Sequence, residues 1–444
     1  MLTHIPFPAL PVPPSWFPGH MLQFQKMLPA LLNKTDVVLE LRDSRLPLTS
    51  INRNFEGALQ KWRRERRQGG AAESTSPSLD TGVSRPTNGP VSQRVVVFSK
   101  RDLVPEWGIK VCSGSICGLA VLTEERVQPF QRAMASKFPD QKVFFASWNR
   151  ARDIRALSEL LVNVAREHPY RSELNVLVVG MPNVGKSTLL NALRNIGIAG
   201  PTPKALRTSA QPGMTRVLST RLKLSVDPLV YAYDSPGVML PFLGKGMVGA
   251  ERGVKLALIA GIKEGLYDTE ALASYLLYRL NVLDPVSPAY LKLLPPDTPP
   301  LLDVQEFLAL LARRLCMLKR GGIPDSARAA VWFIKWWREE GGLASASAPA
   351  LPDYSGVPGL ETYRRGWGFD LEWNVDAAEA SRYDEATIQA KMEDCIDRFE
   401  EAGSLEEREG GSISSTQEKK RLKEQQKARQ RARSKARLAS RKSS

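Results

Sequence analysis

Residues 174–191 read LNVLVVGMPNVGKSTLLN and decide how the rest of the chain is interpreted. An apolar, strand-like run ends at Gly180, and the pattern G-x-x-x-x-G-K-S follows through Ser187 before a helix-like segment begins. This order of strand, glycine-rich loop and helix is typical of a phosphate-binding loop. Its backbone N–H groups and the positive end of the helix surround phosphate oxygens. The stretch therefore predicts a site for a nucleoside triphosphate.

The loop residues have separate expected roles in that site. Lys186 would contact the β- and γ-phosphates, and the Ser187 hydroxyl would bind Mg²⁺. The residues expected to contact the nucleotide are Asn183, Val184, Gly185, Lys186, Ser187 and Thr188. A glycine turn without a ligand is the alternative interpretation of this pattern.

The composition indicates an intracellular protein with room for two domains. The chain has 444 residues, of which 43% are hydrophobic, enough for buried cores. Its four cysteines form no C-x-x-C pair, so the pattern predicts neither a zinc site nor a disulfide framework. No apolar run approaches the ~20 residues of a membrane span. Residues 1–14 contain no Lys or Arg, so no basic amphipathic presequence is visible.

Most of the net charge of +15 lies at one end of the chain. Residues 419–444 contain twelve Lys or Arg and one acidic residue. Such a basic tail favours binding to nucleic acid, because Lys and Arg replace the counterions of phosphates. A solvated helix or a disordered tail is the alternative. A tryptophan-rich amphipathic pattern at 325–340 is predicted to be core, with base stacking as the other interpretation.

Strand-like and helix-like segments alternate along the first 240 residues. The expected strands are residues 36–41, 94–98, 142–145, 174–180, 217–224 and 229–233, and the expected helices are 21–32, 55–67 and 154–167. This alternation predicts an α/β fold with a mostly parallel sheet and helices on both faces. Further helices are expected at 252–280, 303–319 and 325–340. The Gly-, Ser- and Pro-rich residues 68–93 are predicted to be a disordered insertion.

Two segments after the loop resemble the switches of GTP-binding proteins. Residues 234–237 read DSPG and end a predicted strand, as D-x-x-G does. Asp234 would hold Mg²⁺ through a water molecule, and the Gly237 N–H would contact the γ-phosphate. Thr215, in the sequence PGMT, resembles the threonine that completes the coordination of Mg²⁺. A β-turn and an ordinary loop threonine are the alternatives.

Two segments before the loop predict that the base is guanine. Ser99, Lys100, Arg101 and Asp102 resemble the N-K-x-D motif. The Asp102 carboxylate would accept two hydrogen bonds from the N1 and N2 edge of guanine, which adenine does not offer, and the Lys100 stem would cover the base. Ser99 replaces the usual asparagine, so contacts to the other purine edge are expected to be weaker. Backbone groups of Ala146 and Ser147 would contact the guanine oxygen.

The order of these motifs is permuted relative to ordinary GTPases, because the base-reading segments precede the phosphate loop. A circular permutation allows this when domain termini lie close together. The permuted order, together with WFPGHM, DVVLELRDSRLPL, GMPNVGKSTLLNALR, PGMTR, DSPGVMLP and GVKLALIAG, resembles the circularly permuted ribosome-assembly GTPases. Residues 266–281 resemble the mitochondrial members of that family. The resemblance covers roughly residues 15–340.

The resemblance implies an architecture and a function. Residues 15–283 would form a circularly permuted P-loop GTPase domain that binds GTP or GDP with Mg²⁺. The helical pattern and the composition, rather than the resemblance, predict a smaller helical domain at residues 284–400, and a polar linker and basic tail at residues 401–444. The chain would hydrolyse GTP slowly and assist assembly of the mitochondrial large ribosomal subunit, contacting its rRNA and proteins. Its expected location is the mitochondrial matrix, and peripheral association with the mitochondrial inner membrane is a further expectation.

The resemblance also implies two residue roles beyond the motifs. Val238 stands where a catalytic glutamine is usual, and an aliphatic side chain cannot orient water. Family members with such a replacement are thought to use the histidine of WFPGHM, here His20. Asn183 matches the asparagine linked to K⁺ binding in potassium-activated members. Arg45 or Arg216 as an arginine finger is the alternative, while Asp43 and Arg45 are expected to be structural.

Two other functions fit the same sequence. A nuclear or nucleolar assembly GTPase would use the basic tail as an import signal. A non-catalytic RNA-binding scaffold would have a degenerate nucleotide site, which Ser99 favours and the intact Lys186, Ser187, Asp234 and Gly237 oppose.

Overall fold

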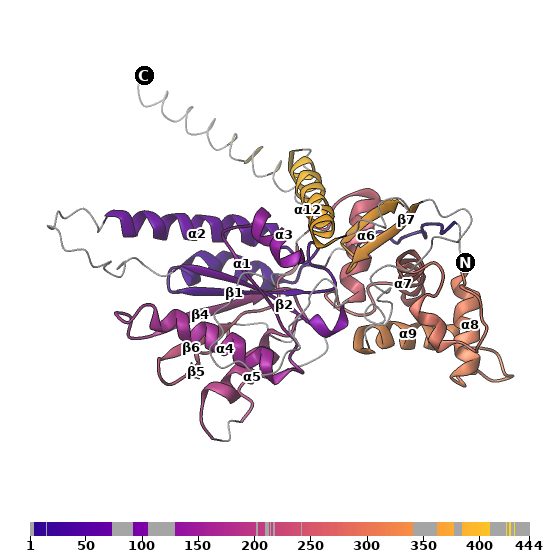
Figure 1. Ribbon diagram of the computed structural model, residues 1–444, viewed down its shortest axis with the longest axis horizontal. Coiled ribbons are helices and arrows are strands. Elements are labelled where there is room, and N and C mark those ends of the chain that lie inside the picture. Colours follow the sequence, from indigo (N-terminus) through magenta and orange to yellow (C-terminus); the bar gives the residue numbers. More distant parts are fainter. Residues whose placement is uncertain are drawn as a thin grey trace.

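Figure 1 shows the computed structural model of the chain, in which a sheet-containing half lies beside a half built mostly of helices. The structure describes residues 4–14, 16–72, 92–104, 129–200, 203–208, 213, 215, 218–240, 242–340, 362–376, 384–408, 423, 426–427 and 430. The predicted insertion beyond residue 72, Arg216 and nearly all of the basic tail lie outside these residues.

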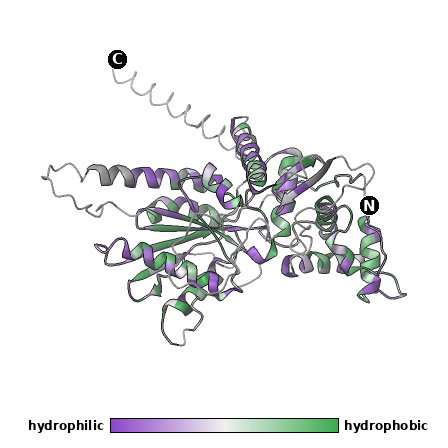
Figure 2. Ribbon diagram, in the orientation of Figure 1, coloured by the Kyte–Doolittle hydropathy of each residue, from purple (hydrophilic) through white to green (hydrophobic). Residues whose placement is uncertain are grey.

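Six strands in the described part of the chain form one sheet in the order β3-β2-β1-β4-β6-β5. Their bounds are β1 Val37–Asp43, β2 Gln93–Ser99, β3 Lys142–Phe145, β4 Leu174–Gly180, β5 Leu222–Ser225 and β6 Val230–Asp234. All neighbours are parallel except β5 and β6. The central strands are apolar and buried on both faces, as parallel sheets require, and Figure 2 shows hydrophobic residues along them. The predicted α/β fold is confirmed.

Helices cover both faces of this sheet (Figure 1). They are α1 Gly19–Leu32, α2 Arg53–Ala72, α3 Pro129–Lys137, α4 Ala151–Arg166 and α5 Lys186–Gly197. In Figure 1, α1, α2 and α3 lie on one side of the sheet, and α4 and α5 on the other. Residues 68–72 continue α2 and Gln93 begins β2, so the predicted insertion of 68–93 is too long at both ends.

One charged cluster is buried within the sheet. Glu40 of β1 is fully buried and accepts hydrogen bonds from Arg42 and from Arg94 of β2. Burial alone would raise the pKa of Glu40, but the two guanidinium groups outweigh it and hold this pKa at about 2. The charged residues in the predicted apolar strand therefore pair with each other across β1 and β2.

The segment predicted as one helix at 252–280 is two helices. These are α6 Gly246–Leu258 and α7 Thr269–Leu283. Ala260 and Gly265 between them have φ of 58° and 84°, which an α-helix does not accommodate. The Asp268 carboxylate accepts from the Ala271 N–H at 3.2 Å and caps α7. The expected strand at 217–224 is also shorter, because β5 begins at Leu222.

The C-terminal part of the chain packs against both halves. The short helix η4 Ala289–Leu293 and the helices α8 Val304–Arg314 and α9 Ser326–Glu340 lie close to α7. A hairpin that the sequence analysis did not predict, β7 Thr362–Trp367 and β8 Leu371–Asp376, follows. The last long helix, α12 Glu385–Arg408, packs against α3 and β8, so the polar linker predicted from residue 401 begins as helix. The domain boundary at 283/284 stays a prediction.

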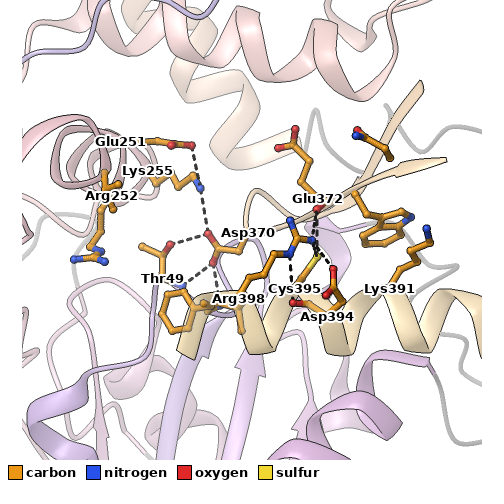
Figure 3. Close-up of a pocket in the computed structure, with 15 residues that line it drawn as sticks. Thr49, Glu251, Arg252, Lys255, Asp370, Glu372, Lys391, Asp394, Cys395 and Arg398 are labelled. Carbon is orange, nitrogen blue, oxygen red and sulfur yellow. Dashed lines mark hydrogen bonds and ion pairs between the residues drawn. The ribbon is translucent and has the colours of Figure 1, made fainter. Parts of the chain in front are cut away.

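Asp370, in the turn of the hairpin, joins it to the loop that follows β1 (Figure 3). Its carboxylate accepts from the N–H groups of Leu48 and Thr49 at 2.9 and 2.7 Å and from the Thr49 hydroxyl at 2.7 Å. Lys255 of α6 lies 3.5 Å from the same carboxylate, which is 3% exposed. One buried side chain therefore connects α6, the hairpin and the sheet-containing half.

Asp370→Ala is expected to destabilise the protein by about 2–3 kcal/mol, because it leaves buried donors without an acceptor. Chemical denaturation measures this change. Asp394→Ala is the matched control. Asp370 and Asp394 line one pocket between α6, the hairpin and α12, but Asp394 makes an exposed ion pair with Arg398 (Figure 3). The control should change the free energy of unfolding by less than about 0.5 kcal/mol. Equal losses in the two variants would contradict this account of Asp370.

Candidate functional site

The carboxyl ends of β1, β2, β4 and β6 lie at one edge of the sheet, because these strands are parallel neighbours. Asp43 at the end of β1 is paired with Ser99 at the end of β2. Asp234 at the end of β6 is paired with Val178, two residues before Gly180. Ligands of open α/β sheets bind at this edge. The fold thus brings together motifs that are up to 135 residues apart in the sequence.

The phosphate loop adopts the backbone that its glycines predicted. Gly180 and Gly185 have φ of 146° and 90°, and a Cβ on Gly180 would overlap the Leu41 carbonyl oxygen. α5 begins directly after Gly185, so its N-terminus faces the loop. Lys186 Nζ donates to the carbonyls of Met181 at 2.7 Å and Gly180 at 3.3 Å. The ammonium group therefore lies across the loop, inside the proposed phosphate cradle.

Three oxygen-bearing side chains converge beside Lys186. The Ser187 hydroxyl donates to Asp234 Oδ2 at 2.6 Å and lies 3.4 Å from the Thr215 hydroxyl. Asp234 Oδ1 is buried and has no hydrogen-bond partner within the described residues. Burial raises the pKa of Asp234, although Lys186 and Ser187 act in the opposite direction. Hard oxygen ligands around a buried, unsatisfied carboxylate oxygen fit Mg²⁺.

Among the described residues, no group of three or more His, Cys, Asp or Glu side chains could hold a metal ion. Mg²⁺ in nucleotide sites is bound by one or two protein groups and by the phosphates themselves. The arrangement of Ser187, Thr215 and Asp234 therefore suits a metal that arrives with its nucleotide.

The DSPG segment packs directly on the phosphate loop. A Cβ on Gly237 would lie 2.6 Å from Pro182 Cα, so a larger residue does not fit there. The Val238 N–H donates to the Gly180 carbonyl at 3.2 Å, and the Val238 side chain is fully buried. Residues of the loop and both switches line one cleft: Pro182, Asn183, Gly185, Lys186, Ser187, Thr188, Arg207, Thr208, Gly213, Thr215 and Gly237.

The base-reading segment ends β2 with a sharp turn. Lys100 has a φ of 57°, and the 3₁₀ helix η1 Arg101–Leu103 follows it. The Lys100 ammonium group donates to Asp43 Oδ2 at 3.0 Å. The buried Ser99 hydroxyl donates to the Arg42 carbonyl at 3.1 Å. Within the described residues the Asp102 carboxylate makes no hydrogen bond or ion pair, which leaves it available to a ligand.

Ala146 and Ser147 differ from the expectation. The Ala146 N–H donates to the Phe98 carbonyl and the Ser147 N–H to Asp153 Oδ2, both at 2.9 Å. In this conformation neither amide is available to the guanine oxygen. The two residues instead hold the base-reading segment, because the Arg101 N–H donates to the Ala146 carbonyl at 3.3 Å.

His20 is brought to the switch segments by the start of α1. Its Cε1 lies 4.0 Å from the position that a Cβ on Gly213 would occupy. The next residue, Met21, accepts a hydrogen bond through its sulfur from the Met239 N–H at 3.5 Å. The imidazole therefore lies near Gly213 of the Thr215 segment, and the adjacent Met21 contacts the residues that follow DSPG.

Comparisons with known proteins identify relatives of this chain. Residues 175–277 match the family model described as 50S ribosome-binding GTPase. Mitochondrial GTPase 1 of Schizosaccharomyces japonicus is 30% identical over 327 residues, covering 73% of this chain and 87% of that protein. The chain belongs to the mitochondrial GTPase 1 family. Mitochondrial ribosome-associated GTPase 1 of Xenopus tropicalis is 30% identical over 274 residues, covering 60% of this chain and 70% of that one. Among solved structures, GNP-bound YlqF from T. maritima is 17% identical, covers 73% of this chain and 96% of that chain, and has a TM-score of 0.40.

As a member of the mitochondrial GTPase 1 family, the chain is a GTPase, which confirms the predicted enzyme class. Its P-loop domain has the permuted motif order that the sequence indicated. The segments at the ends of β2 and β3, expected to read the base, precede the phosphate loop after β4, and the switch-like segments follow it. Trp148, which lies against Gly185, was not among the residues predicted for this site. It follows the end of β3 by three residues, at the ligand edge, which was the available signal. Asp43 was expected to be structural, and its buried carboxylate holds Lys100.

Nucleotide binding by this mitochondrial GTPase 1 relative is expected to weaken at alkaline pH. Burial lowers the pKa of Lys186 to about 8. The lysine must be protonated to bind phosphate, so the affinity of the free protein falls as pH rises through that value. A decrease of about fivefold in GDP affinity is expected between pH 8 and pH 9.

Isothermal titration calorimetry in two buffers of different ionisation enthalpy checks this, because binding above pH 8 should take up close to one proton. An affinity that does not change between pH 7 and pH 9, with no proton uptake, would contradict the proposed role of Lys186.

Proposed function

We propose that this chain is a GTP-hydrolysing assembly factor of the mitochondrial large ribosomal subunit, in which the nucleotide state controls binding to the particle and release from it. The observation that carries the proposal is the arrangement beside Lys186 in which the Ser187 hydroxyl contacts both Thr215 and Asp234, while Asp234 keeps one buried carboxylate oxygen without a partner among the described residues. A degenerate site would not be expected to keep this arrangement. Mg²⁺ bound there would offset the charge of the β- and γ-phosphates.

The ribosomal partner and the mitochondrial location rest on the relatives. Their names include mitochondrial ribosome-associated GTPase 1 in Xenopus tropicalis and in Mus musculus, and the matching family model is described as 50S ribosome-binding. The basic residues of 419–444 support contact with rRNA through salt-sensitive phosphate binding. The described residues include no helix that is long and apolar enough to cross a membrane. A matrix location and peripheral association with the inner membrane stay predictions.

Two sets of hydrogen bonds connect the phosphate loop with the helical half. The Asn183 amide nitrogen in the phosphate loop donates to the Ala260 carbonyl, just after α6, at 2.8 Å. Arg338 of α9 donates to the carbonyls of Leu258 and Ala257 at the end of α6, at 2.7 and 2.8 Å. A shift of the loop on GTP hydrolysis would therefore act on α6 and α9. This supports coupling between nucleotide state and the surface that the helical half presents.

Turnover of GTP with and without mitochondrial large subunits tests the proposal. We expect slow intrinsic hydrolysis that the particles stimulate, and tighter binding to particles with a GTP analogue than with GDP. The same rates with and without mitochondrial particles, but stimulation by cytosolic pre-60S particles, would favour a nuclear or nucleolar assembly GTPase. RNA binding without any GTP turnover would favour the scaffold alternative. A preference for ATP would overturn the guanine assignment.

His20 is proposed to orient the attacking water, because Val238 cannot do so. His20→Ala is expected to lower particle-stimulated kcat by at least about 100-fold while the Kd for GTP stays within about twofold. Single-turnover hydrolysis and nucleotide titration measure the two quantities. His168→Ala is the matched control, since His168 is partly exposed, contacts Tyr170 after α4 and has no expected role in the site. A His20→Ala variant with wild-type turnover would reject this role.

K⁺ is proposed to bind at Asn183, whose amide is oriented by its bond to the Ala260 carbonyl. The amide nitrogen takes that bond, so the oxygen points to the other side of the group and can serve as a cation ligand. We expect faster GTP turnover in K⁺ than in Na⁺ at equal ionic strength. Asn183→Gly should abolish the difference without backbone strain, because φ is 59° there. Equal rates in the two salts for the wild-type chain would exclude this cation site.

A further inference from the structure

Trp148 lies against the phosphate loop, outside every motif that the sequence analysis used. It follows β3 by three residues, between Ser147 and the start of α4. A Cβ on Gly185 would overlap Trp148 Nε1. Gly185 is the residue before Lys186 and lines the cleft described above. The edge of the indole that carries its N–H therefore borders the nucleotide site.

The polar groups of Trp148 have no partner in the described part of the chain. Nε1 is buried and makes no hydrogen bond there, and no described group accepts from the Trp148 backbone N–H. The neighbouring amides are both used, since Ser147 donates to Asp153 and Asn149 donates to the Ser147 hydroxyl. Buried indole N–H groups usually find an acceptor. An indole N–H that is buried beside a phosphate loop without an acceptor points to an acceptor on the bound ligand.

The position of Trp148 places it on the same wall of the site as the base-reading carboxylate. The Arg101 N–H donates to the Ala146 carbonyl, and Arg101 Nε lies 3.3 Å from Asp153 Oδ2, which also binds the Ser147 N–H. These bonds join η1, which contains Asp102, to the segment that carries Trp148. A nucleotide that reaches from Asp102 to Gly185 passes the indole.

We propose that Trp148 contacts the bound guanine nucleotide directly, with its indole N–H donating to a nucleotide oxygen and its ring lying against the base or ribose. The proposal rests on the guanine-nucleotide site argued above and adds a residue to it. The Trp148 backbone N–H, the next free donor along the chain, would also contact the guanine oxygen in place of the amides of Ala146 and Ser147. Asp102 would select guanine, and Trp148 would add affinity, since every base offers a face for stacking.

Two substitutions separate the N–H from the ring. Trp148→Phe keeps an aromatic face but removes the donor, and it is expected to weaken GDP binding about tenfold. Trp148→Ala removes both and should weaken binding by about 50-fold or more. Calorimetric titration of the full-length chain with GDP and Mg²⁺ gives the dissociation constants. Thermal unfolding without nucleotide checks that each variant is folded, and Trp148→Phe keeps the test decisive if Trp148→Ala is not.

Intrinsic fluorescence provides a readout that a structural role would not share. GDP should change the tryptophan emission of the wild-type chain, and Trp148→Phe should lose most of that change. Trp332→Phe is the control, because Trp332 is partly buried on α9 in the helical half. It should keep both the wild-type emission change and the wild-type affinity.

The outcomes distinguish this inference from the proposed function. Wild-type GDP affinity and an unaltered emission change in Trp148→Phe would overturn the contact with Trp148 and leave the guanine site intact. A wild-type chain that binds no guanine nucleotide would overturn both. Weaker binding in Trp148→Phe with loss of the emission change, beside an unaffected Trp332→Phe, is the result that the structure leads us to expect.

Discussion

The buried carboxylate of Asp43 connects the base-reading segment with the helical half of the protein. It is inaccessible to solvent, receives two hydrogen bonds from the Arg45 guanidinium at 2.9 and 2.8 Å, and receives a third from Lys100 at 3.0 Å. Burial alone would raise the pKa of Asp43, but the two cations outweigh it and hold this pKa well below its usual range. Loss of one partner from such a group costs about 3–5 kcal/mol, so its geometry is strongly constrained.

Arg45 extends this constraint to the C-terminal elements. Its guanidinium lies 4.7 Å from the centre of the Trp337 ring on α9, and its carbonyl accepts from the Phe369 N–H at 2.8 Å. Phe369 in turn stacks on Trp337 with 5.2 Å between ring centres. The lysine that is expected to cover the base is therefore positioned by the same ion cluster that holds α9 and the hairpin. The segment expected to recognise guanine and the placement of the helical half thus share one network.

Much of the site was predictable because parallel strands bring their ends to a single edge. The phosphate loop, the Asp234 segment and the Lys100 segment each followed an apolar run, and this pattern does not depend on the order of the strands in the chain. The permutation therefore did not obscure the site. The contacts of individual groups were less predictable. The Ser147 N–H is taken by Asp153, which only the fold of α4 brings near, and the Ala146 N–H is taken by the Phe98 carbonyl.

The fold was predictable where hydrophobic periodicity was strong and was missed where a local conformation decided it. The positive φ of Ala260 divides a continuous helical pattern, and only the tertiary structure fixes it. The hairpin of β7 and β8 is short and rich in tryptophan and charged residues, so its alternation was not visible beside the surrounding polar sequence. Glu40 was placed correctly in a buried strand, but its partners Arg42 and Arg94 become apparent only when β1 and β2 pair.

The packing of the chain's last elements has a consequence for how the protein is made. Phe98 of β2 and Phe130 of α3 belong to a second hydrophobic cluster that is completed by Trp367, Met392 and Ile396. Phe130 and Trp367 stack with 4.7 Å between their ring centres. During synthesis, which proceeds from the N-terminus, the first two aromatic side chains leave the translating ribosome more than 200 residues before the side chains that cover them. The apolar surface formed by Phe98 and Phe130 thus stays without these covering side chains until residues 367–396 have been synthesised.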